Sequence, residues 1–597
     1  MTSNGRGAPF PPPGTPLPPL PPPAPVPAPD GAPSLPPPYE PAAGSPPLPP
    51  PAVPAPTPPG WADGPTAAPQ APPPPAPWAS PAPPPSAPGG WGAAPPPGGW
   101  APQPQGWGAP PGPPSSNGSG RTVVVRLVVA LVVLALGVGA ALIWADGGED
   151  HPSEWDPRVQ DLVAFVEDTW GRDFDHPVAV HMLDADEYRE RATAGEDPAE
   201  EDLSDADDQA AAGRALGLFE GELDLFETGD AMVAEGTAAF YDPMTDEIVV
   251  NGEALDVGTR VTLVHELTHA LQAQVVAAGG GGEELDDTSD AANAYRSLLE
   301  GDATVVEQVY AAQLSDDEYE ELLDASTTSG EDATAALEEA DVPGALQASF
   351  VLPYGLGAPW VDVLLAREDG DGLEAVLVDP PVSTSSMVDL QRSPDEDPVE
   401  VEDPEIAGEV LETDRFGPMS WIVPLAEFTD GPTAFEAVRG WTGDSVVTSR
   451  TAGGRVCVDA AVELRDDTSA TRFEAAVRTW FGQLPPRAGA NVSRDGSSVR
   501  LSSCDPGADA DIALTGRAMD ELGQVVLRNQ LIAELAAAVP DDLVDVAPAP
   551  MSVDAAACTA DRIIASFGAE RLLSDEDLAG SSELLRTATE ARAACGD

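Results

Sequence analysis

Two histidines and a glutamate stand close together in the segment VHELTH, which covers residues 264–269. On an α-helix, residues four apart lie on one face, so His265 and His269 can present two imidazole nitrogens to one metal ion. Glu266 follows the first histidine directly, where its carboxylate can reach a metal-bound water as a general base. This H-E-x-x-H spacing predicts a Zn²⁺ site of the kind that hydrolyses peptide bonds.

The residues around this motif have the pattern of a helix with a buried face. Apolar residues recur at three- and four-residue spacing from Val261 to Leu271. Thr259 is the expected N-cap, and the glycine run over residues 279–282 is the expected stop. The alternative is a chance match of ordinary histidines, but the chain has only 5 of them, which makes such a match rare.

A catalytic zinc commonly has three protein ligands and one open position. No histidine follows His269, and the place of the third histidine of a metzincin is taken by Val275. An acidic residue on a later helix is the remaining choice, and Glu300 is the best candidate. Asp302 or Thr304 would then hydrogen-bond a ligand from outside the coordination shell. The competing interpretation makes Glu300 an ordinary surface glutamate, since acidic residues are common in this chain.

Five stretches of the chain carry a resemblance to a known family. They are LVHELTHALQAQ, AYRSLLEGDATVVE, LPYGLGAPWVDVLL, DPPVSTSSM and GWTGD, of which the first two are the most specific. Over roughly residues 155–485, the chain resembles a family of zinc metallopeptidases from actinobacteria and related bacteria that are gluzincin-like in ligand set. The resemblance implies that His265, His269 and Glu300 bind zinc and that Glu266 is the catalytic base. It leaves the physiological substrate open.

One position departs from the pattern expected of that family. A His-Pro pair is expected after the PP-S-T segment, and the chain has Met387-Val388-Asp389-Leu390 there. A contact of such a histidine with substrate would therefore be missing.

The reaction also needs a group that stabilises the oxyanion in addition to the metal. Tyr354, in the LPYG stretch, is the candidate. Tyr295 and Tyr310 compete with it, and a purely structural place in the core is the alternative for each.

The composition excludes some partners. The 597 residues carry a formal net charge of −73, and every basic residue is an arginine. Such acidity argues against nucleic acid or anionic lipid as a partner, because those surfaces would repel the protein. Residues 1–120, rich in Pro, Gly and Ala, are expected to form a disordered tail of polyproline II and coil. The tail is either a docking segment for unknown partners or a solvated tether.

A single membrane helix is predicted over residues 122–145. Its stretch 127–145 holds no charged residue, and this length is about enough to cross the hydrocarbon core. Arg121 and Arg126 lie on its N-terminal side, whereas acidic residues begin at Asp146 on the other. The positive-inside rule therefore places the tail in the cytoplasm and the rest of the chain outside.

The cysteines agree with that orientation. No C-x-x-C pair is present, so a second metal site is disfavoured, and an even count suits disulfides outside the cytoplasm. Three pairings are possible, and sequence neighbourhood favours two bonds: Cys457–Cys504 and Cys558–Cys595.

The expected fold class is α+β and mainly helical. The predicted regions are a zincin-like domain over 152–446, a small α/β segment over 447–510 and a helical module over 511–597. Hydrophobic periodicity and turn residues predict the elements. Helices are expected at 159–170, 184–191, 209–226, 290–314, 470–480, 513–539 and 555–595, a first strand at 178–183, a hairpin at 238–250 and strands at 455–458 and 499–501. The acidic runs 196–208 and 395–405 are expected to be loops.

Together these features predict a membrane-anchored, extracytoplasmic zinc peptidase that acts on a peptide or protein substrate in the cell envelope. Two alternatives stay open. One is a zincin fold that has lost activity and binds a partner. The other is a non-enzymatic envelope scaffold in which the tail and the C-terminal helices carry the function.

Overall fold

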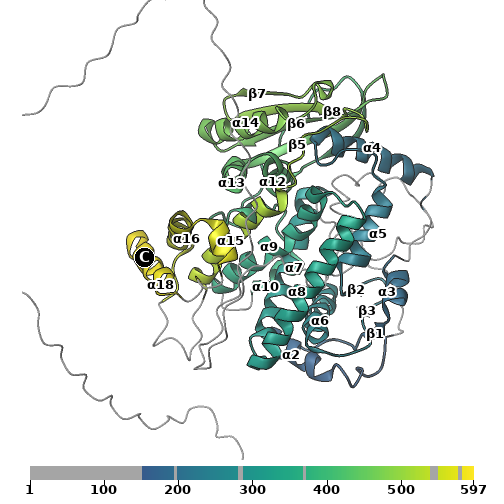
Figure 1. Cartoon of the computed structure of the whole chain (residues 1–597), viewed down its shortest axis with the longest axis vertical. Helices are drawn as coiled ribbons and strands as arrows, with labels where there is room; N and C mark the ends of the chain where they lie inside the picture. Colours follow the sequence, from purple (N-terminus) through teal and green to yellow (C-terminus); the bar gives the residue numbers. More distant parts are fainter. Residues whose placement is uncertain are drawn as a thin grey trace, which may run out of the picture. The chain divides into compact units, whose positions relative to one another are not determined.

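Figure 1 shows the computed structural model of the chain. The structure describes residues 151–596 except 194–197, 199, 280–286, 368–371, 538–548, 576–577 and 579–580. The predicted tail and the predicted membrane helix lie outside these residues and stay predictions. The described part is mainly helical with two β-sheets, as expected for an α+β protein.

A three-stranded sheet precedes the helix that carries the histidines. The hairpin strands pair antiparallel, as predicted, and the first strand pairs parallel with the second hairpin strand. The strand order β1-β3-β2 leaves β2 at one edge. The elements of this part are α2 (Gln160–Trp170), β1 (Ala179–Leu183), α3 (Ala185–Ala192), β2 (Ala239–Asp242) and β3 (Glu247–Asn251).

The helix expected over residues 209–226 is wrong in its bounds. Two helices occupy this part of the chain, α4 (Glu200–Leu216) and α5 (Leu225–Gly236). Gly217 follows α4 with φ 72°, a left-handed conformation that glycine adopts easily, and this turns the chain out of the helix. Helix α4 also includes most of an acidic run that was expected to be a loop, because its alanine-rich second half is buried and supports the whole helix.

The histidine motif lies in α6 (Val257–Ala278). The N-cap is Asp256, whose side chain accepts a hydrogen bond from the Thr259 backbone N–H, so the prediction of Thr259 as the cap was three residues too late. Gly279 follows the last helical residue, which confirms the predicted end.

Helices α7 and α9 pack closely against each other. A Cβ atom on Gly301 would overlap the backbone of Gly357, and one on Gly357 would overlap the carbonyl of Ser297. Only glycine allows this approach, so these two residues set the distance between the helices. The helices of this part are α7 (Ser289–Ala311), α8 (Asp316–Glu339), α9 (Gly344–Arg367) and α10 (Gly372–Val378).

Among the described residues, α9 is long and apolar enough to cross a membrane. However, 78% of its most apolar stretch is buried inside the protein, which is what a core helix requires. The helix has packing partners along its length in α7 and α15 (Ala518–Ala536). We therefore treat it as part of the core, and the predicted anchor remains at 122–145.

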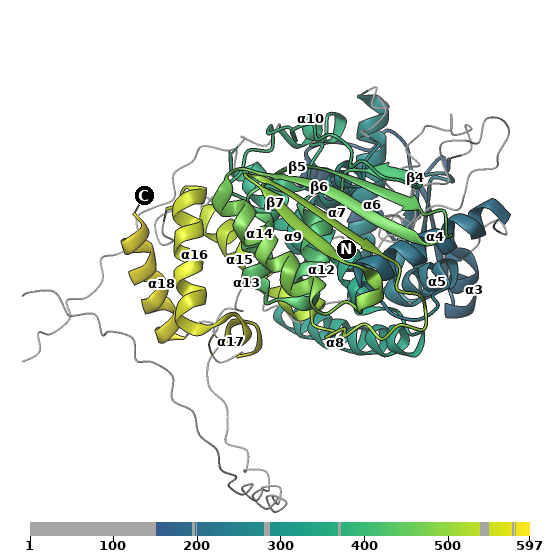
Figure 2. The ribbon, with the colours of Figure 1, turned by 90° about the horizontal axis from the view of Figure 1, so that it is seen from above.

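The second sheet is antiparallel, with the order β4-β5-β6-β8-β7. Strand β5 crosses residue 447 and β4 precedes it, so the sheet begins earlier than the small α/β segment expected over 447–510. Figures 1 and 2 show α14 packed along this sheet. The elements are α11 (Ser385–Val388), β4 (Glu409–Asp414), α12 (Gly417–Phe428), α13 (Gly431–Val438), β5 (Trp441–Arg450), β6 (Val456–Leu464), α14 (Asp467–Phe481), β7 (Asn491–Asp495) and β8 (Ser498–Cys504).

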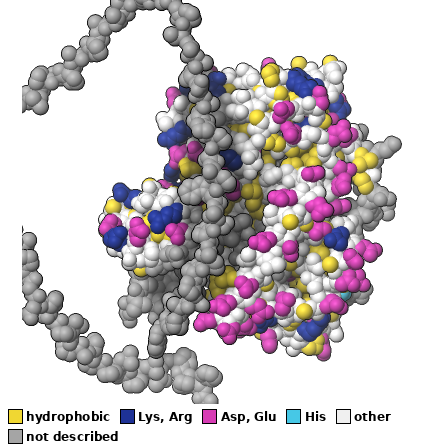
Figure 3. Space-filling model, viewed as in Figure 1, with side chains coloured by type: hydrophobic (Ala, Val, Ile, Leu, Met, Phe, Trp, Pro, Cys, Tyr) yellow, Lys and Arg dark blue, Asp and Glu magenta, His cyan; other side chains and the backbone are white. Residues whose placement is uncertain are grey.

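Both predicted disulfides are confirmed. Cys457–Cys504 joins the paired strands β6 and β8, and Cys558–Cys595 joins two C-terminal helices. These helices and the short one between them are α16 (Val553–Phe567), α17 (Ala569–Ser574) and α18 (Ser582–Cys595). Acidic side chains are spread over the surface shown in Figure 3, in agreement with the strongly negative net charge.

Candidate metal centre

The structure brings His265, His269 and Glu300 together from two helices. The Nε2 atoms of the two histidines are 3.1 Å apart. Glu300 Oε2 lies 3.4 Å from Nε2 of His265 and 3.3 Å from Nε2 of His269. Among the described residues, these three side chains form a group whose ligand atoms all lie within 4.8 Å of one another.

These three distances suit a tetrahedral metal ion. Zinc bonds to histidine nitrogen and carboxylate oxygen are about 2.0–2.2 Å long, which places two ligand atoms of a tetrahedron about 3.3–3.5 Å apart. The observed separations of 3.1, 3.3 and 3.4 Å are close to that value. The residues present therefore fit a three-ligand zinc site with one open position.

The outer nitrogen of each histidine has a hydrogen-bonding partner of its own. His265 Nδ1 lies 3.2 Å from Glu307 Oε2, and His269 Nδ1 lies 2.9 Å from Gln272 Oε1. The Gln272 amide donates in turn to Asp302 at 2.6 Å. When the Nδ1 atoms carry the protons, both Nε2 lone pairs face the metal position. Asp302 is thus near the site as expected, but it acts on His269 through Gln272.

Neither Gln272 nor Glu307 was found from the sequence. Gln272 follows His269 by three residues and so lies on the same side of α6, a spacing that would have identified it. Glu307 belongs to α7, two turns beyond Glu300. No local pattern links it to His265.

Glu266, the predicted general base, lies next to the two histidines on α6. Its side chain is fully buried, and Oε2 accepts a hydrogen bond of 2.9 Å from the Tyr241 backbone N–H. Oε1 has no hydrogen-bond partner among the described residues. Tyr241 belongs to the edge strand β2, so the sheet edge lies beside the motif helix as expected. This contact fixes one carboxylate oxygen and leaves the other able to accept a proton.

The electrostatics of the centre favour a bound positive charge. Burial alone would lower the pKa of His265, but hydrogen bonds to Glu300 and Glu307 raise it to about 10. Burial also opposes ionisation of Glu300, yet its contacts with the two histidines hold its pKa well below the usual range. Burial raises the pKa of Glu266, so this carboxylate holds a proton more easily than an exposed glutamate. Such a shift suits a group that takes a proton from water.

Tyr354 lies directly beside the centre. Its ring stacks on that of His265, with the centroids 6.2 Å apart and the planes at 17°. Burial and the nearby Glu300 charge raise the pKa of Tyr354 well above its usual value, so its hydroxyl stays protonated and can donate a hydrogen bond. The two competing tyrosines lie elsewhere: Tyr295 is in the main core, and Tyr310 packs on Phe165.

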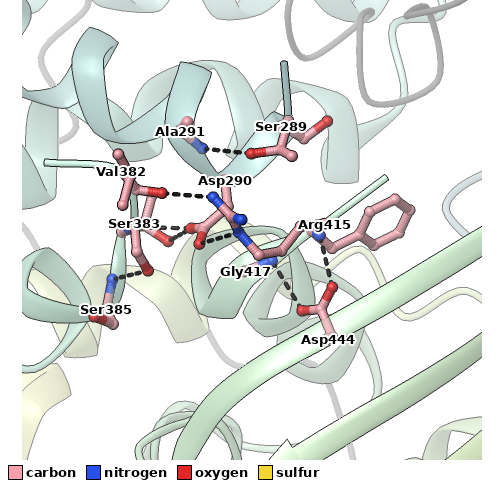
Figure 4. Close-up of polar contacts among 12 residues, drawn as sticks. Ser289, Asp290, Ala291, Val382, Ser383, Ser385, Arg415, Gly417 and Asp444 are labelled. Carbon is pink, nitrogen blue, oxygen red and sulfur yellow. Dashed lines mark hydrogen bonds and ion pairs between the residues drawn. The ribbon is translucent and has the colours of Figure 1, made fainter. Parts of the chain in front are cut away.

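A second polar cluster lies at the start of α7, three turns before Glu300 (Figure 4). Asp290 accepts two hydrogen bonds from Thr384 and contacts Arg415. Asp414 accepts hydrogen bonds from both the backbone and the hydroxyl of Ser289.

Asp444 completes this cluster by accepting four hydrogen bonds. The donors are the backbone N–H groups of Phe416 and Gly417 and the indole N–H groups of Trp421 and Trp441. The DPPVSTSSM and GWTGD stretches therefore meet here and hold the beginning of α7.

The position expected to carry a His-Pro pair is part of the core. Met387 and Val388 are 0% and 1% exposed, and their carbonyl groups accept hydrogen bonds from Asn529. The stretch is packed as a structural element in this chain.

Comparisons with known proteins found no match. No protein-family model, no curated protein and no solved structure matches the chain. The function therefore has to be inferred from the site itself.

Proposed function

We propose that the protein is a zinc-dependent peptidase, anchored by one membrane helix and acting outside the cytoplasm. The observation that carries this proposal is the geometry of His265, His269 and Glu300, whose ligand atoms are spaced as in a tetrahedral zinc site. The resemblance to gluzincin-like metallopeptidases supports the same assignment.

The residues around the site suit hydrolysis of a peptide bond. His265, His269 and Glu300 would hold Zn²⁺, which supplies an acidified water and polarises a carbonyl group. Glu266 Oε1 accepts a proton from the attacking water and returns it to the amine that leaves. Tyr354 donates a hydrogen bond to the negative oxygen that develops on the carbonyl carbon.

The proposed location rests on the sequence and on the disulfides. The segment 122–145 has the length and flanking charges of a single span with its C-terminal side outside. Both disulfides suit an oxidising compartment. A peptide or protein of the cell envelope is the proposed class of substrate.

The first test is the zinc content of the full chain, purified in detergent, with Glu300→Ala as variant. We expect one zinc per chain in the unmodified protein and its loss, or at least 100-fold weaker binding, in the variant. Glu320→Ala is the matched control, since Glu320 is exposed on α8. Equal zinc content in all three proteins would remove Glu300 from the site.

The second test is hydrolysis of a mixed peptide library by the zinc-loaded protein and by Glu266→Gln. We expect cleavage that falls by at least about 1,000-fold in the variant while zinc content is unchanged. Zinc without cleavage that depends on Glu266 would indicate an inactive zincin fold. A chain without zinc would favour the scaffold alternative.

A further inference from the structure

An unusual buried arginine lies next to the metal ligands. Arg296 is 3% exposed, and its Nε atom lies 3.6 Å from Glu300 Oε1. Its guanidinium carbon is 5.0 Å from the ring centre of Phe350 and 5.3 Å from that of Tyr354. Its Nη1 and Nη2 atoms have no hydrogen-bond partner among the described residues.

Neutralising Glu300 does not account for this side chain. That contact uses the Nε end, whereas Nη1 and Nη2 carry the four remaining N–H donors. The Tyr354 hydroxyl also interacts with the guanidinium, but a single hydroxyl cannot accept from all four. Leaving buried donors without acceptors costs free energy, so they persist where another molecule supplies the acceptors. The planar pair of Nη atoms matches the two oxygens of a carboxylate. The expected ligand is therefore a carboxylate.

The position of Arg296 suits one particular carboxylate of a peptide. Arg296 Nε lies 3.6 Å from Glu300 Oε1, and the other oxygen of the same carboxylate faces both histidine Nε2 atoms, so the guanidinium is about one amino-acid length from the metal position. In a peptide chain, successive carbonyl carbons are about 3–4 Å apart, so a terminal carboxylate lies one residue beyond the last peptide carbonyl. A carbonyl at the metal would thus place the carboxylate of the C-terminal residue near Arg296.

An apolar cavity lies beside Asn293, the residue that precedes Arg296 on the same face of α7. Asn293, Arg296 and Glu300 are spaced by three and four residues and share one face of α7. Asn293 lines a cavity with apolar residues that include Leu352, Met419 and Trp421. Asn293 is 1% exposed, and its Oδ1 atom has no hydrogen-bond partner among the described residues. The cavity is suited to an apolar side chain.

We propose that the enzyme is a carboxypeptidase for peptides with an apolar C-terminal residue. Arg296 binds the terminal carboxylate, and the cavity beside Asn293 accepts the last side chain. This inference rests on the proposed peptidase function. In the reaction, the water oxygen bonds to the last peptide carbonyl carbon and the C–N bond breaks. Glu266 carries the water proton to the amine, and the products are a shortened peptide and one free amino acid.

The test compares two substrates that differ at a single group, with the zinc-loaded full chain as enzyme. They are a blocked dipeptide that ends in leucine with a free carboxylate and the same compound with a terminal amide. We expect kcat/KM at least 100-fold higher for the acid. Arg296→Lys keeps the positive charge but removes the paired Nη donors. In this variant the preference for the acid should fall below tenfold, mainly because the KM for the acid rises.

A matched control separates this role from a general effect of removing a buried arginine. Arg528 is 7% exposed and lies 4.7 Å from the ring centre of Phe435 in another part of the protein. Arg528→Lys should keep the preference for the acid. Equal cleavage of acid and amide by the unmodified protein, with activity that depends on Glu266, would overturn the inference and leave the peptidase proposal standing.

A binding measurement makes the inference testable without turnover. The probe is 2-benzylsuccinic acid, whose two carboxylates can reach the metal and Arg296 together, compared with its monoamide. Calorimetry on zinc-loaded Glu266→Gln should give a Kd at least 30-fold lower for the diacid, and the added Arg296→Lys change should remove this difference. Equal affinity for both compounds would reject Arg296 as the carboxylate site. A protein that binds no zinc would reject the peptidase proposal and the inference with it.

Discussion

Two buried polar clusters share helix α7 and differ in how their hydrogen bonds are satisfied. At the start of the helix, Asp414 and Asp444 accept hydrogen bonds from backbone and side-chain donors of the same protein, and Asp290 Oδ2 forms an ion pair with Arg415. Around the middle of the helix, among the described residues, Glu266 Oε1 on the neighbouring helix α6 has no hydrogen-bond donor, and the Nη atoms of Arg296 have no acceptor in hydrogen-bond geometry.

This difference separates the roles of the clusters. A buried polar group that has its partners fixes one arrangement of the chain, whereas one without partners costs stability and is kept where a ligand completes it. The first cluster therefore holds α7 in place, and the second one has the open hydrogen-bonding positions that the proposed metal ion and substrate would fill. Variants in the first should affect stability, and variants in the second should affect binding.

The largest effect is expected from Asp444→Ala. The change leaves four buried donors without an acceptor, among them the indoles of Trp421 and Trp441, at about 1–3 kcal/mol each. We expect a loss of at least about 4 kcal/mol in unfolding free energy, seen as a lower Tm of the zinc-free protein. Asp444→Asn keeps one acceptor and should lose less. If Asp444→Ala instead kept its Tm and lost zinc, the division between the clusters would be wrong.

A substitution directly after Glu300, where α7 packs on α9, should disturb both properties. In Gly301→Ala, the new Cβ overlaps the backbone of Gly357, so α7 and α9 must move apart. We expect a loss of about 3 kcal/mol in stability together with weaker zinc binding, because Glu300 and Tyr354 move relative to each other. Gly258→Ala is the control, since a Cβ there meets only ordinary van der Waals contacts. Unchanged zinc affinity in Gly301→Ala would show that the helix spacing does not position the site.

The parts of the site that lie within one helix could be predicted from the sequence. The spacing of His265, Glu266 and His269 needs only the helical repeat, and the structure places all three at the centre. Glu300 lies on a second helix, so no spacing within one helix links it to the histidines. It was predicted because no third histidine is available and because the family resemblance implies it. Glu307 and Arg296 could not be found, since their roles depend on how α6, α7 and α9 pack.

The fold shows the same limit. The hairpin and both disulfides follow from short-range patterns and were predicted correctly. The helix expected over 209–226 failed, because its apolar period ran past Gly217, where the chain turns. The cap of α6 was misplaced because Thr259 and Asp256 are both good N-caps, and the Thr259 hydroxyl itself donates to Asp256.

The cluster at the start of α7 should also make the stability of the protein depend on pH. Burial raises the pKa of Asp414 to about 7 and that of Asp444 to about 6, above the value of about 3.9 in an unfolded chain. The folded state therefore binds more protons between pH 4 and 7, so the contribution of these groups to stability falls as pH rises through that window.

Asp414→Asn removes one of these titrations. Relative to the unmodified protein, the variant should gain about 3 kcal/mol in unfolding free energy between pH 4.5 and pH 7.5, since the pKa of about 7 lies about 2.5 pH units above the lower end of this window and one pKa unit corresponds to about 1.4 kcal/mol. Any constant loss from the changed hydrogen bond to Ser289 cancels in this comparison. Chemical denaturation at the two pH values measures the difference, and parallel curves for both proteins would contradict the assigned shift.

The smallest effect is expected from Gln272→Ala, which removes the amide between His269 and Asp302 but no metal ligand. His269 then loses the acceptor for its Nδ1–H, so its ring and tautomer are less well fixed. We expect about tenfold weaker zinc binding, or about 1.4 kcal/mol, by competition with a chelator. Gln272→Glu keeps an acceptor and should bind zinc at least as tightly as Gln272→Ala. Identical zinc affinity of Gln272→Ala and the unmodified protein would show that packing alone orients His269. Zinc binding would then depend only on the three ligand side chains, and the hydrogen bonds around them would have no part in it.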